Sequence, residues 1–113
     1  MSFQETDYGY ELKNSHFTVF FGNKNSTLGN LKEAYPNFQF LRLKQIHSPS
    51  IVDSNHQTPD FEILADGHFT NESNLALCSI TADCIPAFLF NTRTNQIAAL
   101  HAGWRGVASQ ILP

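Results

Sequence analysis

The fold is decided by residues 75–101, which read LALCSITADCIPAFLFNTRTNQIAALH. Three segments in this stretch are almost wholly apolar: residues 75–80, 85–90 and 97–100. Short apolar runs favour β-strands, and continuous ones are typical of strands covered on both faces. The polar residues 91–96 separate the second run from the third and predict a turn. We therefore expect a sheet in this part of the chain.

The segments before this stretch predict further elements. Two are rich in aromatic and aliphatic residues and favour strands, residues 16–21 and 38–46. Residues 28–34 predict a short helix that Ser26 or Thr27 caps and that ends before Pro36. Residues 107–112 predict the first turns of another helix. This combination of strands and few helices predicts an α+β fold.

The length of 113 residues (12.7 kDa) suits one domain, or half of a larger one. With 42% hydrophobic and 15% charged residues, the chain has enough apolar surface to fold around a core. Because the strands outnumber the helices that could cover them, we expect the N-terminal half of a larger fold, truncated at the C-terminus. Such a chain would expose apolar surface and self-associate. The alternative is a small, complete α+β domain.

Charge and composition exclude several classes of protein. The net charge of −3 and the pI of about 5.9 argue against binding to nucleic acid or to an anionic membrane. No apolar stretch reaches the roughly 20 residues that span a bilayer. The first residues lack the pattern of a secretory signal, so we expect a cytoplasmic protein. In that reducing compartment Cys78 and Cys84 would remain free thiols.

Three potential metal ligands stand at the ends of predicted strands: His47, Cys84 and His101. They are 37 and 17 residues apart, too far for a zinc finger or ribbon, which pairs ligands a few residues apart. Strand ends that meet in space could assemble them into one site. Two imidazoles and a thiolate would leave a fourth position open, as in catalytic zinc sites. Packing alone could also explain all three residues.

Other side chains near these positions have two interpretations each. Asp83 could orient an imidazole or exchange protons with a substrate, or it could accept backbone hydrogen bonds at a turn. Arg105, at the start of the terminal helix, could clamp a phosphate or carboxylate, or form a surface ion pair. Trp104 could stack on a ligand ring or pack on the sheet. Asp66 could be a turn residue or hold a ligating histidine.

The remaining histidines and the second cysteine predict no chemistry. His16, His56 and His68 have no matching ligand partners and are expected at the surface or in the core. Cys78 lies within a predicted strand and is expected to be an inert thiol.

Four motifs together resemble a known family. They are residues 43–48 (LKQIHS), 65–67 (ADG), 81–86 (TADCIP) and 101–106 (HAGWRG), in this order. They resemble the YfiH-like family, also called the multicopper polyphenol oxidoreductase (laccase) or DUF152 family. The resemblance extends over residues 38–112. It implies that residues 1–113 are one laccase-type domain, the N-terminal portion of a four-layer α/β/β/α fold with mixed sheets.

The resemblance also implies a function. Members bind one zinc ion through a His-Cys-His set, which here corresponds to His47, Cys84 and His101. They split purine nucleosides (adenosine, inosine, guanosine and methylthioadenosine) with phosphate into base and ribose 1-phosphate, and they deaminate adenosine as a second reaction. Zinc is expected rather than copper, because five scattered histidines cannot build a multicopper site. An open zinc ion could activate water for deamination or hold a phosphate oxygen.

The chemistry of such a site suggests roles for the neighbouring residues. We expect Asp83 to donate or accept a proton and Arg105 to neutralise phosphate, with Cys84 in the catalytic set. Lys44, Trp104 and Arg105 are expected to contact the substrate.

Two other functions remain open on the sequence. In a metal-free Cys–His hydrolase, Cys84 would be the nucleophile and His101 the base. Alternatively, the chain could be an inactive zinc-binding fragment that acts only as a binding module.

Overall fold

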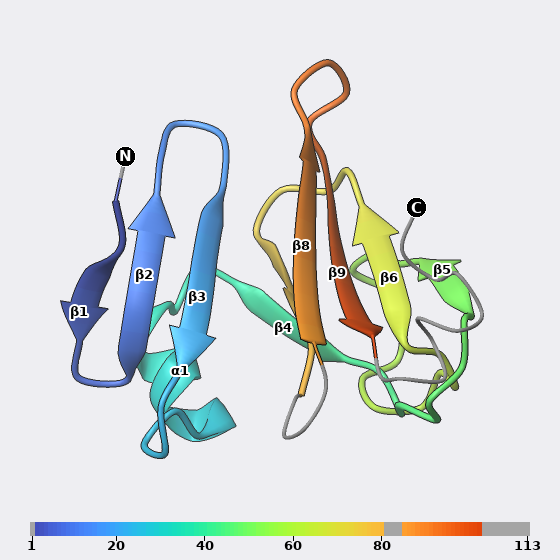
Figure 1. Ribbon diagram of the computed structural model, residues 1–113, viewed down its shortest axis with the longest axis horizontal. Helices are drawn as coiled ribbons and strands as arrows, with labels where there is room; N and C mark the ends of the chain where they lie inside the picture. Colours follow the sequence, from blue (N-terminus) through green and yellow to red (C-terminus); the bar gives the residue numbers. More distant parts are fainter. Residues whose placement is uncertain (1, 81–84, 103–113) are drawn as a thin grey trace. The chain divides into compact units, whose positions relative to one another are not determined.

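The computed structural model describes residues 2–80 and 85–102. Contacts divide the chain into two compact units, Met1–Phe38 and Gln39–Pro113 (Figure 1). No helix in the described ranges is long and apolar enough to cross a membrane. The predicted helix at 107–112 lies outside the described residues.

The first unit is a three-stranded antiparallel sheet with one helix. The strands are β1 (Gln4–Thr6), β2 (Gly9–Lys13) and β3 (Thr18–Gly22), in that order. The sheet is larger than expected, because the polar first residues gave no sign of β1 and β2. Gly9 begins β2 at φ 146°, a conformation that suits glycine because it has no Cβ.

Helix α1 (Leu28–Ala34) forms as predicted. The Thr27 hydroxyl accepts a hydrogen bond from the Asn30 N–H at 3.1 Å, so the cap is Thr27. Tyr35 follows the helix just before Pro36, and its ring packs edge-on against Phe20 of β3. The Tyr35 hydroxyl also donates a hydrogen bond to Glu11 of β2, which fixes the helix end on this sheet.

The second unit contains two sheets. A parallel pair consists of β4 (Gln39–Arg42) and β7 (Leu75–Cys78). A four-stranded sheet has the order β5-β6-β9-β8, formed by β5 (Ile51–Asp53), β6 (Gly67–Thr70), β8 (Ile85–Asn91) and β9 (Gln96–Ala102). β5 pairs parallel with β6, whereas β6, β9 and β8 are antiparallel. The expected α+β class with mixed sheets is confirmed.

The predicted strand at 38–46 is too long, and one strand was missed. The predicted strand at 38–46 ends at Arg42, and Lys44 then makes only an isolated bridge with Leu64. β6 was not predicted, because Asp66-Gly67 is typical of a turn. Gly67 is needed within the sheet: a Cβ there would lie 2.6 Å from the Leu100 side chain on β9.

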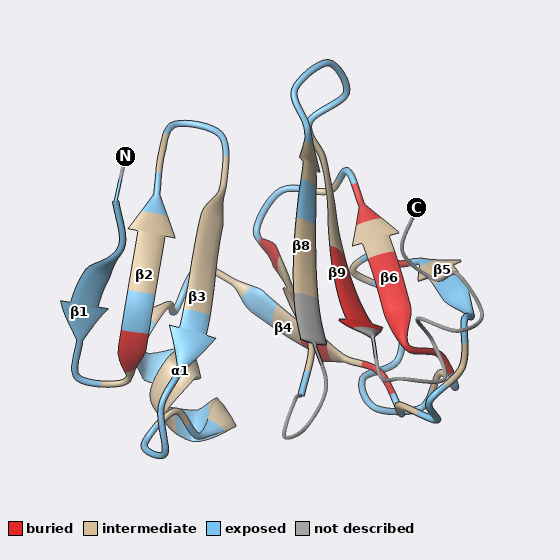
Figure 2. Cartoon of the chain, in the orientation of Figure 1, coloured by how far each residue is buried: buried red, intermediate tan, exposed pale blue. Residues whose placement is uncertain are grey.

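The core of the second unit surrounds β6 and the end of β9, where the buried residues gather (Figure 2). Its apolar members are Leu41, Leu43, Ala65, Leu75, Ala99 and Leu100. Polar residues are buried beside them: Ser54, Asp66, His68, Thr70 and His101. Such groups must find hydrogen-bond partners to be stable there. This polar part of the core contains the candidate site.

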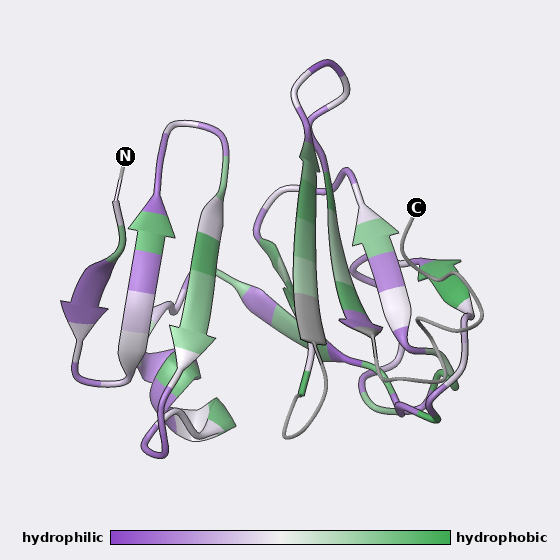
Figure 3. Ribbon diagram, viewed as in Figure 1, coloured by the Kyte–Doolittle hydropathy of each residue, from purple (hydrophilic) through white to green (hydrophobic). Residues whose placement is uncertain are grey.

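The edge strand β8 differs from its prediction. Its sequence is strongly hydrophobic (Figure 3), yet Leu89 is 50% exposed and its described neighbours are half-buried. β8 is therefore not covered on both faces by the described residues. Self-association through such apolar surface remains a prediction.

Candidate functional site

Asp66 is the centre of the candidate site. It directly precedes β6 and is only 1% exposed. Its Oδ1 accepts hydrogen bonds from the backbone N–H groups of Ile46 and Ser48, both at 2.9 Å. Its Oδ2 accepts the N–H of His47 at 3.0 Å. The carboxylate thus accepts the backbone N–H groups of three consecutive residues that follow β4.

The same carboxylate also binds His101. His101 Nδ1 lies 2.7 Å from Asp66 Oδ2, and the His101 residue is 4% exposed. The backbone N–H of His101 donates to the Asp66 carbonyl at 2.6 Å, as part of the alignment of β9 with β6. Both main chain and side chain therefore hold His101 in place. Of the two interpretations of Asp66, the structure supports the one in which it holds this histidine.

Hydrogen bonding keeps Asp66 ionised. Burial acts in the opposite direction and would raise its pKa. Hydrogen bonds from the Ser48 N–H, from His101 and from the N–H groups of Ile46 and His47 outweigh it, so the pKa of Asp66 is lowered. The negatively charged carboxylate of Asp66 thus contacts both histidines, through the ring of His101 and the backbone N–H of His47.

His47 lies beside His101, and the two ring centroids are 5.3 Å apart. His47 is exposed and has φ 57°, a left-handed conformation that is uncommon for a residue other than glycine. Two of the three predicted metal ligands are therefore brought together. The third, Cys84, lies outside the described residues, as do Asp83, Trp104 and Arg105.

The described histidines fit a shared metal ion. Because Asp66 occupies Nδ1 of His101, the other ring nitrogen, Nε2, is left to bind a metal. A tetrahedral zinc ion lies about 2 Å from each ligating nitrogen, which places two bound imidazole centres about 5 Å apart. The observed 5.3 Å agrees with this value. In the described ranges alone, no group of three or more His, Cys, Asp or Glu side chains could hold a metal ion.

Gln45 is a site residue that sequence reasoning missed. Its Nε2 donates to the Ile80 carbonyl at 2.7 Å, and the Ile80 N–H donates to its Oε1 at 2.8 Å. Gln45 thus anchors the segment that immediately precedes residues 81–84. The signs of this role were its place in the motif at residues 43–48 and its position two residues before His47.

Lys44 lies within the described residues, and its side chain is near Phe61, not near the two histidines. It is exposed, and its Nζ lies 5.7 Å from the ring centroid of Phe61. Its contact with substrate stays a prediction.

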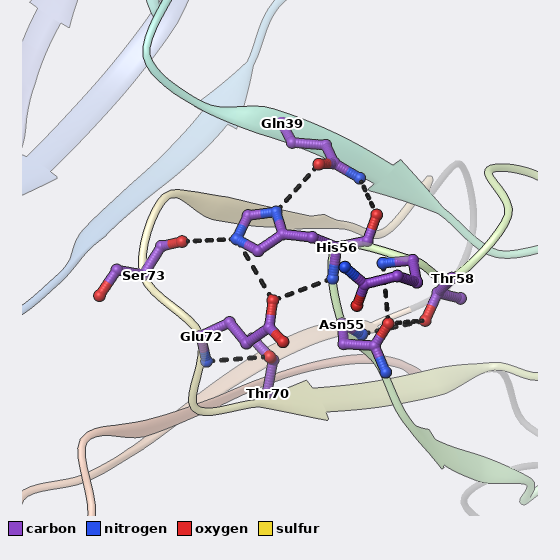
Figure 4. A network of polar contacts seen from close by, with 8 residues as sticks. Gln39, Asn55, His56, Thr58, Thr70, Glu72 and Ser73 are labelled. Atoms are coloured by element: carbon purple, nitrogen blue, oxygen red, sulfur yellow. Dashed lines mark hydrogen bonds and ion pairs between the residues drawn. The ribbon is translucent and has the colours of Figure 1, made fainter.

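The other histidines lie where the sequence predicted. His56 belongs to a surface network in which its Nδ1 lies 2.9 Å from Gln39 Oε1 and its Nε2 lies 2.9 Å from the Ser73 carbonyl (Figure 4). The backbone N–H of His56 also donates to Glu72 at 2.9 Å. His68 is buried in β6, where Nδ1 lies 3.3 Å from Ser54 Oγ. Both side chains therefore make contacts within the fold, with residues outside the candidate site.

Cys78 also has a structural environment. It is half-buried in β7, and burial raises its pKa to about 11. A thiol with so high a pKa is a poor nucleophile at neutral pH, as expected for an inert cysteine.

Comparison with known proteins identifies the family. Residues 3–113 match the family described as multi-copper polyphenol oxidoreductase laccase. The chain belongs to this family. The match includes the N-terminal unit, beyond the residues 38–112 on which the resemblance was based.

Curated relatives of this laccase family are named purine nucleoside phosphorylase. The protein of Clostridium acetobutylicum is 30% identical over 90% of this chain and 48% of its own length. The protein of Haemophilus influenzae is 37% identical over 62% of this chain and 28% of its own length. The laccase-family chain described here thus spans about half the length of the relatives it matches, or less.

Two solved structures are similar in fold to the part of this chain that they match. A Neisseria meningitidis protein of the DUF152 family is 30% identical, with a TM-score of 0.60, over 74% of this chain and 34% of its own. YlmD from Geobacillus stearothermophilus is 29% identical, with a TM-score of 0.59, over 73% of this chain and 34% of its own.

Proposed function

We propose that this chain forms the metal-binding part of a purine nucleoside phosphorylase. The reaction transfers the ribosyl group of a nucleoside to phosphate and releases the free base and ribose 1-phosphate. Adenosine, inosine, guanosine and methylthioadenosine are the proposed substrates, with deamination of adenosine as a second activity. The main supporting observation is the pair of neighbouring imidazoles, His47 and His101, one of them oriented by the buried Asp66. The names of the curated relatives support the same reaction.

The proposed metal is zinc, held by His47, Cys84 and His101. A mixed nitrogen and sulfur set suits zinc, whereas a blue-copper oxidase would need further histidine sites that five histidines do not provide. His56 already belongs to a surface network, and His68 is buried in β6, where its Nδ1 contacts Ser54. When bound, zinc supplies Lewis-acid chemistry at the site.

The chain's own residues supply the remaining functions in this proposal. Arg105 binds phosphate, and Asp83 holds or delivers a proton. Trp104 and Lys44 contact the nucleoside. Lys44 is exposed and therefore accessible to a ligand. A reducing cytoplasm would preserve Cys84 as a free thiolate ligand, so we propose that location.

The test combines elemental analysis with a screen of purine nucleosides in the presence and absence of phosphate. We expect about one zinc ion per chain and release of base that depends on phosphate. His101→Ala should lose both the metal and the activity. His56→Ala is the matched control, because it removes a histidine of the surface network, and it should retain both. Turnover of a nucleoside by this chain would rule out the inactive binding module, whereas zinc without turnover of any nucleoside would support it.

A metal-free Cys–His hydrolase is the second candidate, because an aspartate that orients a histidine also occurs in nucleophilic catalytic triads. Rapid alkylation of Cys84 in a zinc-replete sample would support this alternative. Protection of Cys84 by zinc, lost on chelation, would support the metal site, since a ligated thiolate is shielded from alkylation.

A further inference from the structure

We infer that Asp66 is a positioning residue for both histidines of the site at once. It sets which nitrogen His101 presents, and it holds the His47 backbone in its left-handed turn. The effect of Asp66 on metal affinity rests on the proposed metal site. The tautomer of His101 can be measured without a metal.

The first part concerns the tautomer of His101. An ionised carboxylate can only accept hydrogen bonds, so the hydrogen of a neutral His101 ring must reside on Nδ1, 2.7 Å from Asp66 Oδ2. The Nε2 lone pair is then free to bind a metal ion or to accept a proton. Among the described residues, Asp66 is the side chain that hydrogen-bonds to Nδ1.

The second part concerns the turn that contains His47. The N–H groups of residues 46, 47 and 48 all point at the Asp66 carboxylate. Successive N–H groups of this kind form an anion-binding concavity called a nest, and here the carboxylate is the bound anion. Ser48 adds its hydroxyl at 3.2 Å. A left-handed residue such as His47 persists only where its surroundings stabilise it. Here those surroundings are chiefly the oxygens of Asp66.

One substitution tests both parts, because an amide cannot do what the carboxylate does. In Asp66→Asn only one of the two carboxylate oxygens remains an acceptor. If the amide oxygen faces His101, the NH2 group faces the N–H donors of Ile46 and Ser48, and the turn is destabilised. If the amide oxygen faces those donors, the NH2 group faces Nδ1 of His101 and favours the tautomer protonated on Nε2. Either arrangement removes one of the two functions.

The first measurement uses the unmodified chain without metal. Long-range proton–nitrogen correlation spectra of the imidazole rings, in mildly alkaline buffer, report which nitrogen carries the hydrogen. We expect His101 in the Nδ1–H form. An Nε2–H form, or an equal mixture, would overturn the inference whether or not any variant folds.

The second measurement is the affinity for zinc, and for cobalt as a spectroscopic probe, in calorimetric and absorption titrations. We expect Asp66→Asn to bind either ion about 10- to 100-fold more weakly, as is typical when the hydrogen-bond partner of a ligating histidine is lost. Asp53→Asn, at an exposed position at the end of β5, is the matched control and should leave the affinity unchanged. Equal affinities for Asp66→Asn and the control would overturn the inference. If the unmodified chain bound neither ion, the proposed metal site would fail, while the tautomer spectra would still decide the role of Asp66.

Discussion

His101 Nδ1 lies 2.7 Å from Asp66 Oδ2, and the two side chains are 5% and 0% exposed. This bond joins the start of β6 to the end of β9, across 35 residues of sequence. It stabilises the core, because it satisfies a buried carboxylate, and it orients a candidate ligand. Stability and the proposed function therefore involve the same pair of residues.

Asp66→Ala should lower the free energy of unfolding by about 3 kcal/mol or more. The change leaves the buried ring N–H of His101 without its acceptor, at a cost of about 1–3 kcal/mol, and it removes the acceptor of three part-buried N–H groups, those of residues 46–48. Urea denaturation of the metal-free chain measures the loss. Asp53→Ala, at an exposed position, should change stability by less than about 0.5 kcal/mol. Similar losses for the two variants would contradict the central role of Asp66.

Gln45→Glu should loosen the segment that leads to Cys84. The glutamate keeps an acceptor for the Ile80 N–H but loses the donor to the Ile80 carbonyl, so two oxygens then face each other. We expect the Ile80 amide to exchange its hydrogen about tenfold faster, which corresponds to about 1.4 kcal/mol of lost local stability. Hydrogen exchange followed by NMR measures this effect. Gln57→Glu, an exposed change of the same kind, should leave Ile80 unchanged.

His68 should make the fold sensitive to acid. Burial lowers its pKa from 6.5 to about 4, and the nearby Cys78 backbone opposes this shift only in part. As the pH falls from 6.5 towards 4, the unfolded chain binds a proton at this histidine and the folded chain does not. The folded state should therefore lose up to about 3 kcal/mol over this range and none of it above 6.5.

The control for this pH dependence is His68→Gln, which retains a polar group near Ser54 but does not titrate. Between pH 6.5 and 4 its free energy of unfolding should fall less steeply than that of the unmodified chain. The reason is that unfolding of the variant takes up about one proton fewer. Parallel pH profiles for the two proteins would show that His68 is not buried in its neutral form.

Cys78 should react slowly with iodoacetamide. Burial, followed by the negative charge of Asp60, raises the pKa of its thiol to about 11. At neutral pH the reactive thiolate is then only about 0.01% of the population, against about 3% for a free cysteine. In a Cys84→Ser variant, labelling in buffer should be roughly 100-fold slower than labelling in urea. Equal rates would mean that Cys78 is accessible in the folded state.

Local features of the fold were predictable because local chemistry decides them. Thr27 followed by a short helix and Pro36 is a complete set of boundary signals, and the helix forms between them. The strands at 75–78, 85–91 and 96–102 follow from apolar runs on either side of a polar turn. The strands β1 and β2 were missed, because their polar residues carry no such signal and strand pairing alone defines them.

The sequence by itself determined which side chains could form the site and that an α+β fold would contain them. It placed His47 and His101 at the ends of extended segments, and the structure brings their rings within 5.3 Å. The function of Asp66 was settled only by the tertiary structure. An Asp-Gly pair suits a turn on local grounds, yet here it begins a central strand and its carboxylate meets donors 18 to 35 residues away. No local pattern encodes such contacts, because they exist only once the sheet has aligned β6 with β9.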